Sequence, residues 1–436
     1  MRHHNAVANF GPEIHLNLNV RGLPLSATLS INEKSVELQR QGKEVFRLGL
    51  GQSPFPVPQP VVDELKANAF QKDYLPVMGL RELRGAVAEY HRKFHGIDYT
   101  GSDVLIGPGS KELMFILLLV YYGDLVIPTP SWVSYAPQAQ ITGRHIHWLP
   151  TSLANGLRLT PEELEKLCRQ DPARPRVIIL NYPNNPTGCT YKMEELKAIA
   201  RVARKYRAIL LSDEIYGELH HLGQHVSIAR FYPEGTIISG GLSKWCGAGG
   251  WRLGTFLFPK SLYWLRDAMA AVASETYTST SAPIQYAAVR AFKHGAEIER
   301  YLMQCRRILR VMGRYIAKQL RKTGIAVPDP EGGFYLFINF NPFREQLIKR
   351  GIDTSEKLCT SLLEETGVAI LPGQAFGRPG EEFSARLAYV DFDGARALSA
   401  AEQTPASKHL DSAFLKLYAP KIVAATDRIC RWVSVL

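Results

Sequence analysis

Short apolar runs alternate with amphipathic stretches along most of the chain. Apolar residues keep a helical spacing from Leu80 to Phe94, and a capping box at Thr160–Glu163 begins a second helix that we expect to run to Arg169. The runs typical of strands are Leu125–Ile127, His145–Leu149, Val177–Leu180, Ala208–Leu211, Thr236–Ser239 and Thr255–Phe258. This alternation predicts an α/β fold with a mostly parallel sheet and helices on both faces.

The pattern changes towards the C-terminus. A long helical pattern from Pro283 to about Thr323 precedes a mixture of strand-like and helical segments. These segments are Phe334–Phe340, Ser355–Glu365 and Arg386–Asp391. We therefore predict a large domain over residues 56–314 and a smaller α+β domain formed by residues 1–55 and 315–436.

A glycine-rich segment, Ser239–Gly254, carries Lys244 and, eight residues later, Arg252. A lysine amine can form a Schiff base with the aldehyde of pyridoxal phosphate, and an arginine can hold that cofactor's phosphate with two parallel hydrogen bonds. Most lysines are solvated surface charges, so this segment needs the support of other motifs.

Two further motifs follow apolar strands. Asn185-Pro186-Thr187-Gly188 predicts a rigid turn, which by itself is equally typical of an ordinary loop. The apolar run Ile209–Leu211 leads through Ser212 into Asp213, and Tyr216 follows three residues after this acid. An acid at the end of a buried strand requires a partner such as a protonated pyridine nitrogen, although a helix N-cap is the alternative interpretation.

Together these segments resemble the aspartate-aminotransferase family, fold type I of the pyridoxal-phosphate enzymes, from about Gly49 to Tyr389. The resemblance implies that Lys244 carries the internal aldimine of pyridoxal 5'-phosphate and that Asp213 pairs with the pyridinium nitrogen. The other residues that it implies for the cofactor are Asn185 and Tyr216 at the 3-hydroxyl and Ser243 and Arg252 at the phosphate.

The same resemblance gives roles to residues upstream. Asp103–Phe115 predicts a strand, a glycine-rich turn and a helix, whose first backbone amides form an anion site. The implied phosphate contacts there are Gly109, Ser110 and Lys111. Trp132 is expected to stack on the pyridine ring, with a plain core tryptophan as the alternative.

Substrate contacts are implied at both ends of the chain. Arg386 matches the arginine that binds the substrate α-carboxylate, and Gly51 matches a backbone contact to the same group. Trp132 and Asn185 are expected to touch the substrate as well. Tyr74 matches a tyrosine that reaches the phosphate of the neighbouring subunit, which implies a homodimer with shared active sites.

Two positions depart from the family pattern. Many relatives have a serine three residues before the lysine, whereas this chain has Gly241, so one phosphate donor is missing or replaced. No clear counterpart exists for the second arginine of dicarboxylate-specific members. The amino acid and the oxo acid therefore stay open.

Composition excludes several other classes. The chain has 436 residues and a formal net charge of +11, but its densest basic stretch, residues 297–318, opens with acids and is typical of a solvated helix face, so we expect no nucleic-acid partner. The apolar stretch Leu113–Tyr122 is too short to span a membrane. The pair His220-His221 has no third ligand nearby, so we expect no metal site.

Location and chemistry complete the predictions. Six widely spaced cysteines and an N-terminus with Arg2, His3 and His4 but no apolar signal indicate a reducing cytoplasm. We predict an aminotransferase that moves an amino group from an L-amino acid to a 2-oxo acid by a ping-pong mechanism. The alternatives are a lyase that catalyses C–S β-elimination, an amino-acid oxidase or hydroxylase on the same fold, and, remotely, a non-catalytic sensor that binds the cofactor.

Overall fold

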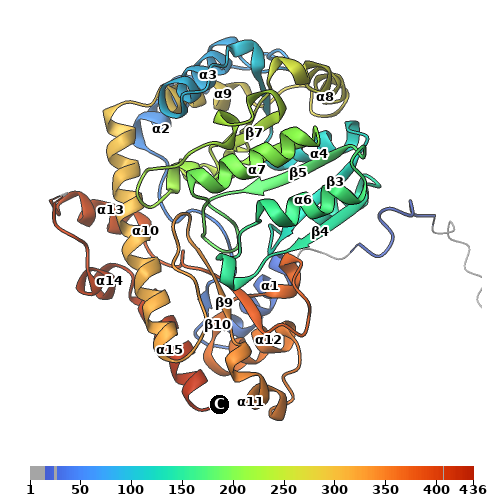
Figure 1. Ribbon diagram of the computed structural model, residues 1–436. Coiled ribbons are helices and arrows are strands. Elements are labelled where there is room, and N and C mark those ends of the chain that lie inside the picture. The colour runs from blue at the N-terminus through green and yellow to red at the C-terminus, as the bar shows by residue number, and fades with distance from the viewer. Residues whose placement is uncertain (1–14, 24–26, 406) are drawn as a thin grey trace, which may run out of the picture.

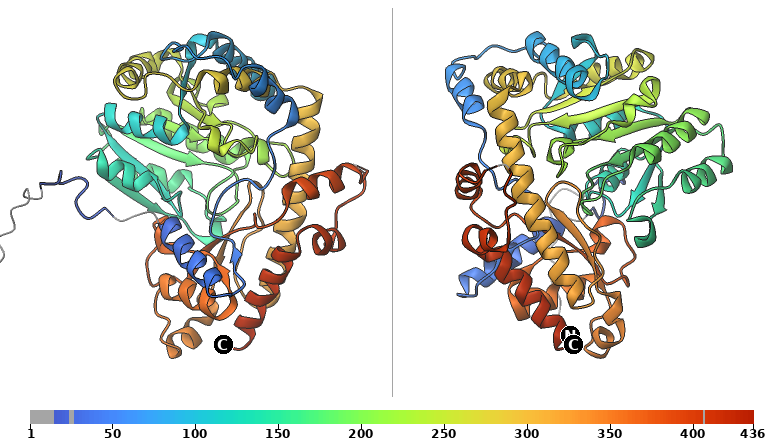
Figure 2. Two further views of the ribbon diagram at one scale, coloured as in Figure 1. Left: turned by 180° about the vertical axis from the view of Figure 1, so that it is seen from behind. Right: turned by 60° about the vertical axis from the view of Figure 1, so that its left-hand side comes forward.

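The computed structural model describes residues 15–23, 27–405 and 407–436. The segment with Arg2, His3 and His4, which entered the prediction about export, lies outside the described residues. Figure 1 shows an upper part built on a central sheet and a lower part built on a smaller sheet. The long helix α10 (Ala296–Lys322) runs along both parts, as the two views in Figure 2 also show.

The central sheet has seven strands in the order β2-β8-β7-β6-β5-β3-β4. Their bounds are β2 Val104–Gly107, β3 Asp124–Thr129, β4 Ile146–Pro150, β5 Arg176–Asn181, β6 Ile209–Asp213, β7 Thr236–Gly241 and β8 Gly254–Leu257. Strands β3 to β7 are parallel, and β8 is antiparallel to both of its neighbours. The predicted α/β fold with a mostly parallel sheet is confirmed.

Helices cover both faces of this sheet because its inner strands are apolar on both sides. On β5 and β6, Ile178 and Leu210 pack against α6 (Pro161–Gln170) and α7 (Met193–Lys205). The residues before and after Ile178 and Leu210 point to the other face of the sheet. The helices on that face are α4 Ser110–Val120, α5 Tyr135–Ile141 and α8 Tyr263–Thr276. Consecutive residues at the end of β6 therefore point to opposite sides of the sheet.

The upper part is completed by α2 (Gln59–Ala67), α3 (Arg81–His95) and α9 (Ala282–Lys293). The prediction of one helical pattern from Pro283 to Thr323 is wrong, because α9 and α10 are separate helices. His294 has φ 59° and Gly295 has φ 116°, and these left-handed conformations end the first helix and redirect the chain.

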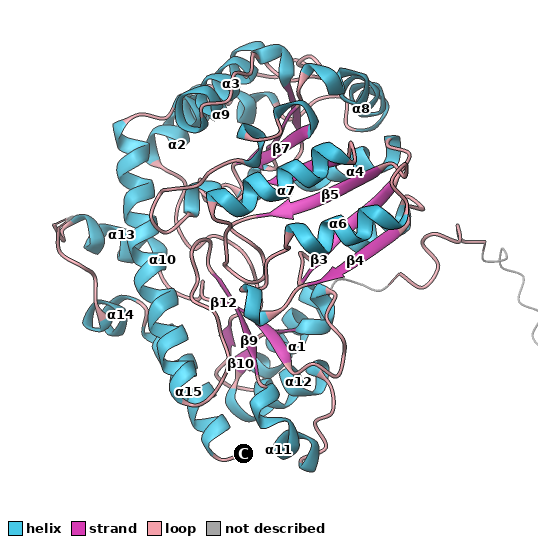
Figure 3. Ribbon diagram, in the orientation of Figure 1, coloured by secondary structure: helices cyan, strands magenta, loops and turns pink. Residues whose placement is uncertain are grey.

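The lower part, whose strands are magenta in Figure 3, contains an antiparallel sheet in the order β11-β12-β9 and a parallel pair of β1 with β10. The strands are β1 Phe46–Arg47, β9 Tyr335–Asn339, β10 Val368–Ala369, β11 Leu371–Pro372 and β12 Ser384–Ala388. The helices are α1 Ala27–Arg40, α11 Arg344–Lys349, α12 Ser355–Thr366, α13 Gly394–Glu402, α14 Ser412–Tyr418 and α15 Pro420–Ser434. The predicted domain boundary after residue 314 falls inside α10, so the domain division stays a prediction.

Among the described residues, no helix combines the length and the apolar character that a membrane span requires.

Candidate active site

A cavity of about 450 Å³ opens where the parallel strands of the central sheet end. This volume lies within the range that small-molecule sites occupy. The side chains that line the cavity are Ser110, Lys111, Trp132, Asn181, Asn185, Asp213, Ile215, Tyr216, Ser243, Lys244 and Arg252. The structure thus brings together nine of the residues that the sequence predicts for the site.

Cations and helix amides gather at one end of the cavity. Ser110 is the first residue of α4, where backbone N–H groups are unpaired and anions are favoured. Arg252 lies directly over Gly109, because a Cβ atom on that glycine would come within 2.1 Å of the guanidinium. The pKa of Lys111 is lowered by burial and by the nearby Arg252. This end is suited to a phosphate group, whose charge would relieve the crowding of cations.

Lys244 is buried in the cavity wall and has an unusual acid–base state. Its Nζ donates a hydrogen bond of 2.7 Å to the carbonyl oxygen of Gly51 and lies 5.7 Å from the ring centre of Tyr216. Burial, reinforced by Arg386 and Arg252, lowers the pKa of this amine to about 8. About a tenth of the amine is therefore neutral, and hence nucleophilic, at pH 7, far more than for an ordinary lysine with a pKa of about 10.4.

Asp213 provides the only carboxylate in the cavity wall, as far as the described residues define it. Its Oδ2 accepts a 2.6 Å hydrogen bond from Tyr135, and Asn181 donates to its backbone oxygen. Burial raises the pKa of Asp213 to about 6, although the hydrogen bond from Tyr135 opposes that rise. No cationic side chain in the described ranges forms an ion pair with it. The carboxylate is therefore available to a cation from outside the chain.

Arg386 reaches the same region from β12 in the lower part. Its Nη1 donates to Oδ1 of Asn185 at 3.1 Å, and its Nη2 donates to the carbonyl oxygen of Gly49. Within the described part of the chain, its buried Nε has no hydrogen-bond partner. Burial lowers the pKa of this guanidinium. A buried arginine with an unused donor is suited to a carboxylate ligand.

Two predicted positions need separate comment. Gly241 has φ 149°, and a Cβ atom there would come within 2.6 Å of the carbonyl oxygen of Leu253, so this backbone leaves no room for the serine that relatives carry. The side chain of Tyr74 is absent from the cavity of its own chain and is 88% exposed.

Comparison with known proteins identifies the family. Residues 43–391 match the family described as aminotransferase class I and II. The chain belongs to this family. An aspartate aminotransferase of Geobacillus stearothermophilus is 35% identical over 381 residues, which cover 85% of this chain and 93% of that protein. An aspartate/prephenate aminotransferase of Thermus thermophilus is 31% identical and covers 86% of this chain and 94% of its own length.

A solved structure agrees with the sequence comparison. The aspartate aminotransferase of Thermus thermophilus with maleate superimposes with a TM-score of 0.81 at 28% identity, and it covers 96% of this chain and 100% of its own. The predicted fold type I architecture is confirmed. The protein is a pyridoxal-phosphate-dependent aminotransferase, and nothing in these comparisons favours a lyase, an oxidase or a sensor.

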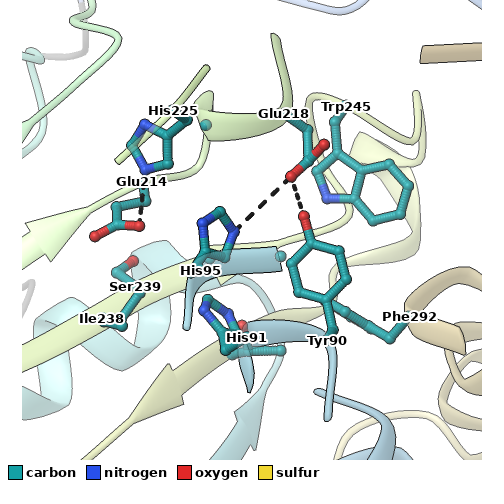
Figure 4. A pocket seen from close by; sticks show the side chains of 14 residues that line it. Tyr90, His91, His95, Glu214, Glu218, His225, Ile238, Ser239, Trp245 and Phe292 are labelled. Carbon is teal, nitrogen blue, oxygen red and sulfur yellow. Dashed lines mark hydrogen bonds and ion pairs between the residues drawn. The ribbon is translucent and has the colours of Figure 1, made fainter. Parts of the chain in front are cut away.

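The aminotransferase contains a second buried polar group, which borders β7 and which Figure 4 shows from close by. Glu214 accepts hydrogen bonds from Ser212 at 2.7 Å and from Ser227 at 2.5 Å, and it pairs with His225 at 2.8 Å. Burial alone would raise the pKa of Glu214, but the attraction of His225 prevails and lowers it to about 2.

Two histidines of α3 complete this group, which we call the histidine cluster (His91, His95, Glu214, Glu218 and His225). Burial lowers the pKa of His91 to about 3 and also lowers that of His95, so both rings are neutral at physiological pH. Among the described residues, no set of three or more His, Cys, Asp or Glu side chains is placed to hold a metal ion.

The sequence prediction missed some residues of the site. Tyr135 lies in the same motif as Trp132, three residues later, yet only the structure shows its contact with Asp213. Asn181 is the last residue of β5, and its Oδ1 accepts the backbone N–H of Asn185. Its position at a strand end was a signal that could have been used. Ile215 adds an apolar surface to the cavity.

Proposed function

We propose that the aminotransferase moves the amino group of an L-amino acid to a 2-oxo acid in this cavity, with Lys244 as its catalytic lysine. One observation carries the proposal: Lys244 is a buried amine with a pKa of about 8, and its cavity also contains Asp213 and the cationic end near Arg252. The phosphate-suited end, the free carboxylate and the nucleophilic amine match the three functional ends of pyridoxal phosphate.

That match assigns residues to each part of the cofactor. Arg252, Ser243, Lys111 and the amides at Gly109 and Ser110 would bind the phosphate, and Trp132 would cover one face of the ring. Tyr216 and Asn185 would contact the 3-oxygen. When bound, the cofactor supplies an electron sink that stabilises negative charge at the substrate α-carbon.

Asp213 and Lys244 would act on different protons. Asp213 would hold the proton on the ring nitrogen, because a carboxylate favours a cation beside it. Lys244 would take the proton from the substrate α-carbon at its Nζ and return it on the cofactor side. To do so, this amine must leave the carbonyl oxygen of Gly51.

Arg386 would fix the substrate for these transfers. Its unpartnered Nε and its bonded Nη atoms face the region between β12 and Asn185, where an α-carboxylate would bind. Gly51 would contribute a backbone contact. We further propose an acidic amino donor such as aspartate, because similar proteins are named for that amino acid.

A donor panel tests the proposal. Purified protein loaded with pyridoxal phosphate is given aspartate, alanine, tyrosine or cysteine, with 2-oxoglutarate, pyruvate or oxaloacetate as acceptor. We expect transfer with aspartate to be the fastest. A neutral donor that is faster by about tenfold would contradict the substrate class alone, whereas pyruvate release from cysteine without amino transfer would contradict the reaction.

The assembly and the location are part of the proposal. Tyr74 and Phe70 are 88% and 74% exposed, and we propose that this surface meets a second copy, whose active site receives Tyr74. A mixture of Tyr74→Phe and Lys244→Ala subunits should regain the cofactor affinity that the Tyr74→Phe homodimer lacks. Heterodimers without that gain, or an active monomer in sedimentation, would contradict it.

We propose a cytoplasmic location, which cell fractionation tests.

A further inference from the structure

Tyr335, on β9, contacts three of the proposed site residues without lining the cavity. Its Oη lies 2.8 Å from the Oη of Tyr216, and the two rings meet edge to face with centres 5.5 Å apart. A Cβ atom on Gly51 would come within 2.1 Å of this hydroxyl, and the Arg386 guanidinium lies 4.9 Å from the ring centre. Tyr335 is 1% exposed, so these contacts are fixed by packing.

The distances around Tyr335 bear on which hydroxyl donates. Tyr335 has two acceptors, namely Tyr216 at 2.8 Å and the carbonyl oxygen of Gly51 at 3.4 Å. The second acceptor is distant and already accepts a 2.7 Å hydrogen bond from Lys244. A donor–acceptor distance near 2.8 Å is typical of a strong O–H···O bond, whereas 3.4 Å is long. Either hydroxyl can donate in the 2.8 Å contact, and its shorter distance favours Tyr335 as the donor to Tyr216 over Tyr335 as the donor to Gly51.

This direction decides what Tyr216 can do. A phenol has a single hydrogen, so if Tyr216 donated to Tyr335 it would have none for a ligand. When Tyr335 is the donor, the hydrogen of Tyr216 is free to point into the cavity that its side chain lines. A hydrogen bond accepted by Tyr216 also makes its own O–H a stronger donor, because successive hydrogen bonds polarise one another.

We propose that Tyr335 is a positioning residue that donates its hydroxyl hydrogen to Tyr216 and so directs the Tyr216 hydrogen at the 3-oxygen of the bound cofactor. This inference rests on the proposed function, in which Tyr216 contacts that oxygen. A donor to the 3-oxygen withdraws negative charge from it and makes the nitrogen that Lys244 contributes to the loaded cofactor less basic. Tyr335 therefore tunes that basicity through Tyr216.

The test is a pH titration of the absorbance of the protein-bound cofactor. Tyr335→Phe keeps the ring under Arg386 and removes only the hydroxyl. We expect its titration midpoint to move upward by about half to one pH unit, the size that corresponds to one lost hydrogen bond. Tyr216→Phe should move the midpoint further in the same direction, because it removes the donor itself.

A double variant separates action through Tyr216 from a direct effect. If Tyr335 acts through Tyr216, then Tyr216→Phe combined with Tyr335→Phe should titrate like Tyr216→Phe alone. Additive shifts, or an unshifted midpoint in Tyr335→Phe, would overturn the inference while leaving the proposed function intact.

Tyr389→Phe is the matched control. Tyr389 is also fully buried, and its hydroxyl donates to the carbonyl oxygen of Gly333 at 3.2 Å and, within the described part of the chain, not to Tyr216. We expect no shift in this variant, and a shift equal to that of Tyr335→Phe would overturn the inference. A wild-type protein with no Lys244-dependent absorbance band would overturn the proposed function and this inference together.

Discussion

Asp213 and Glu214 are neighbours in the chain and both are buried, but they face opposite sides of the central sheet and carry opposite pKa shifts. Asp213 accepts a hydrogen bond from a neutral phenol, and its pKa rises to about 6. Glu214 pairs with His225 and accepts two serine hydroxyls, and its pKa falls to about 2.

The pKa values of Asp213 and Glu214 differ because of the groups that each carboxylate contacts, and not because of how deeply each is buried. Burial is the largest influence on each carboxyl group and raises both pKa values, so burial alone would make the two residues alike. Among the described residues, Glu214 pairs at 2.8 Å with the basic side chain of His225, whereas Asp213 forms no such pair. Asp213 keeps an uncompensated charge in a ligand cavity, which is typical of a group that awaits a cationic ligand.

The largest effect expected on the cavity side comes from Lys244→Ala. Without this amine the protein has no nucleophile for the cofactor and no base for the α-carbon, so turnover should fall by at least about 10⁴-fold. The absorbance band of the protein-bound cofactor should disappear as well. Lys197→Ala, at a partly exposed lysine of α7, should keep both. A surviving band in Lys244→Ala would show that another residue holds the cofactor.

The second change alters the charge of Asp213 and keeps its shape. Asp213→Asn should lower kcat by more than about tenfold, or about 1.4 kcal/mol of barrier, because an amide cannot hold the proton on the ring nitrogen. The matched control is Glu214→Gln, the same chemical change on the other side of the sheet. Comparable kcat values for the two variants would show that the charge of Asp213 matters no more for turnover than the charge of Glu214.

The third prediction concerns the stability of the histidine cluster. Glu214→Gln should lower the free energy of unfolding by about 3 kcal/mol, since it removes a buried carboxylate that His225, Ser212 and Ser227 all contact. Urea unfolding of the cofactor-free protein measures this effect. Once folded, the variant should turn over within about twofold of the wild type. A stability loss below about 1 kcal/mol would show that the contacts of the Glu214 carboxylate contribute little to folding.

The smallest effect expected is a difference in pH dependence. Glu214 has a folded pKa below its usual 4.5, so its contribution to stability is present above pH 4.5 and is lost as the pH falls towards 2. Asp213 has a folded pKa above its usual 3.8, so its contribution is present below pH 3.8 and is lost as the pH rises through 6.

The direction of the pH dependence that Asp213 gives to stability can be measured on the cofactor-free protein. Between pH 5 and pH 7 the wild type should lose about 1 kcal/mol of unfolding free energy that Asp213→Asn keeps. Denaturant titrations at the two pH values give the comparison. Parallel changes in both proteins would show that the pKa of Asp213 is close to its ordinary value.

The sequence predicted the parts of this molecule that depend on local patterns. Each strand of the central sheet that it named has a counterpart within one or two residues, because a short apolar run between turns carries its own signal. Lys244, Asp213 and Asn185 were predicted from their motifs and from the family resemblance that the motifs carry, and they lie together because parallel strands place their carboxyl ends at one edge of the sheet. A motif at one strand end then indicates the position of the others.

Contacts between distant segments could not be predicted in this way. Tyr135 meets Asp213 across 78 residues and Tyr335 meets Tyr216 across 119, and both contacts depend on packing between segments that no single motif contains. The break at His294 was missed because the hydrophobic spacing continues on both sides of it. The crowding at Gly241 depends on the carbonyl of Leu253 on the returning loop.

The contacts of Arg386 also have a consequence for the order of assembly during synthesis. Its guanidinium bonds Asn185 across 201 residues and Gly49 across 337, and β1 finds its strand partner only at β10. A ribosome delivers the N-terminal segments first. Residues 46–51 must therefore wait without their partners until residues 368–386 have been made, so a nascent chain contains the residues that line the cavity before it contains Arg386.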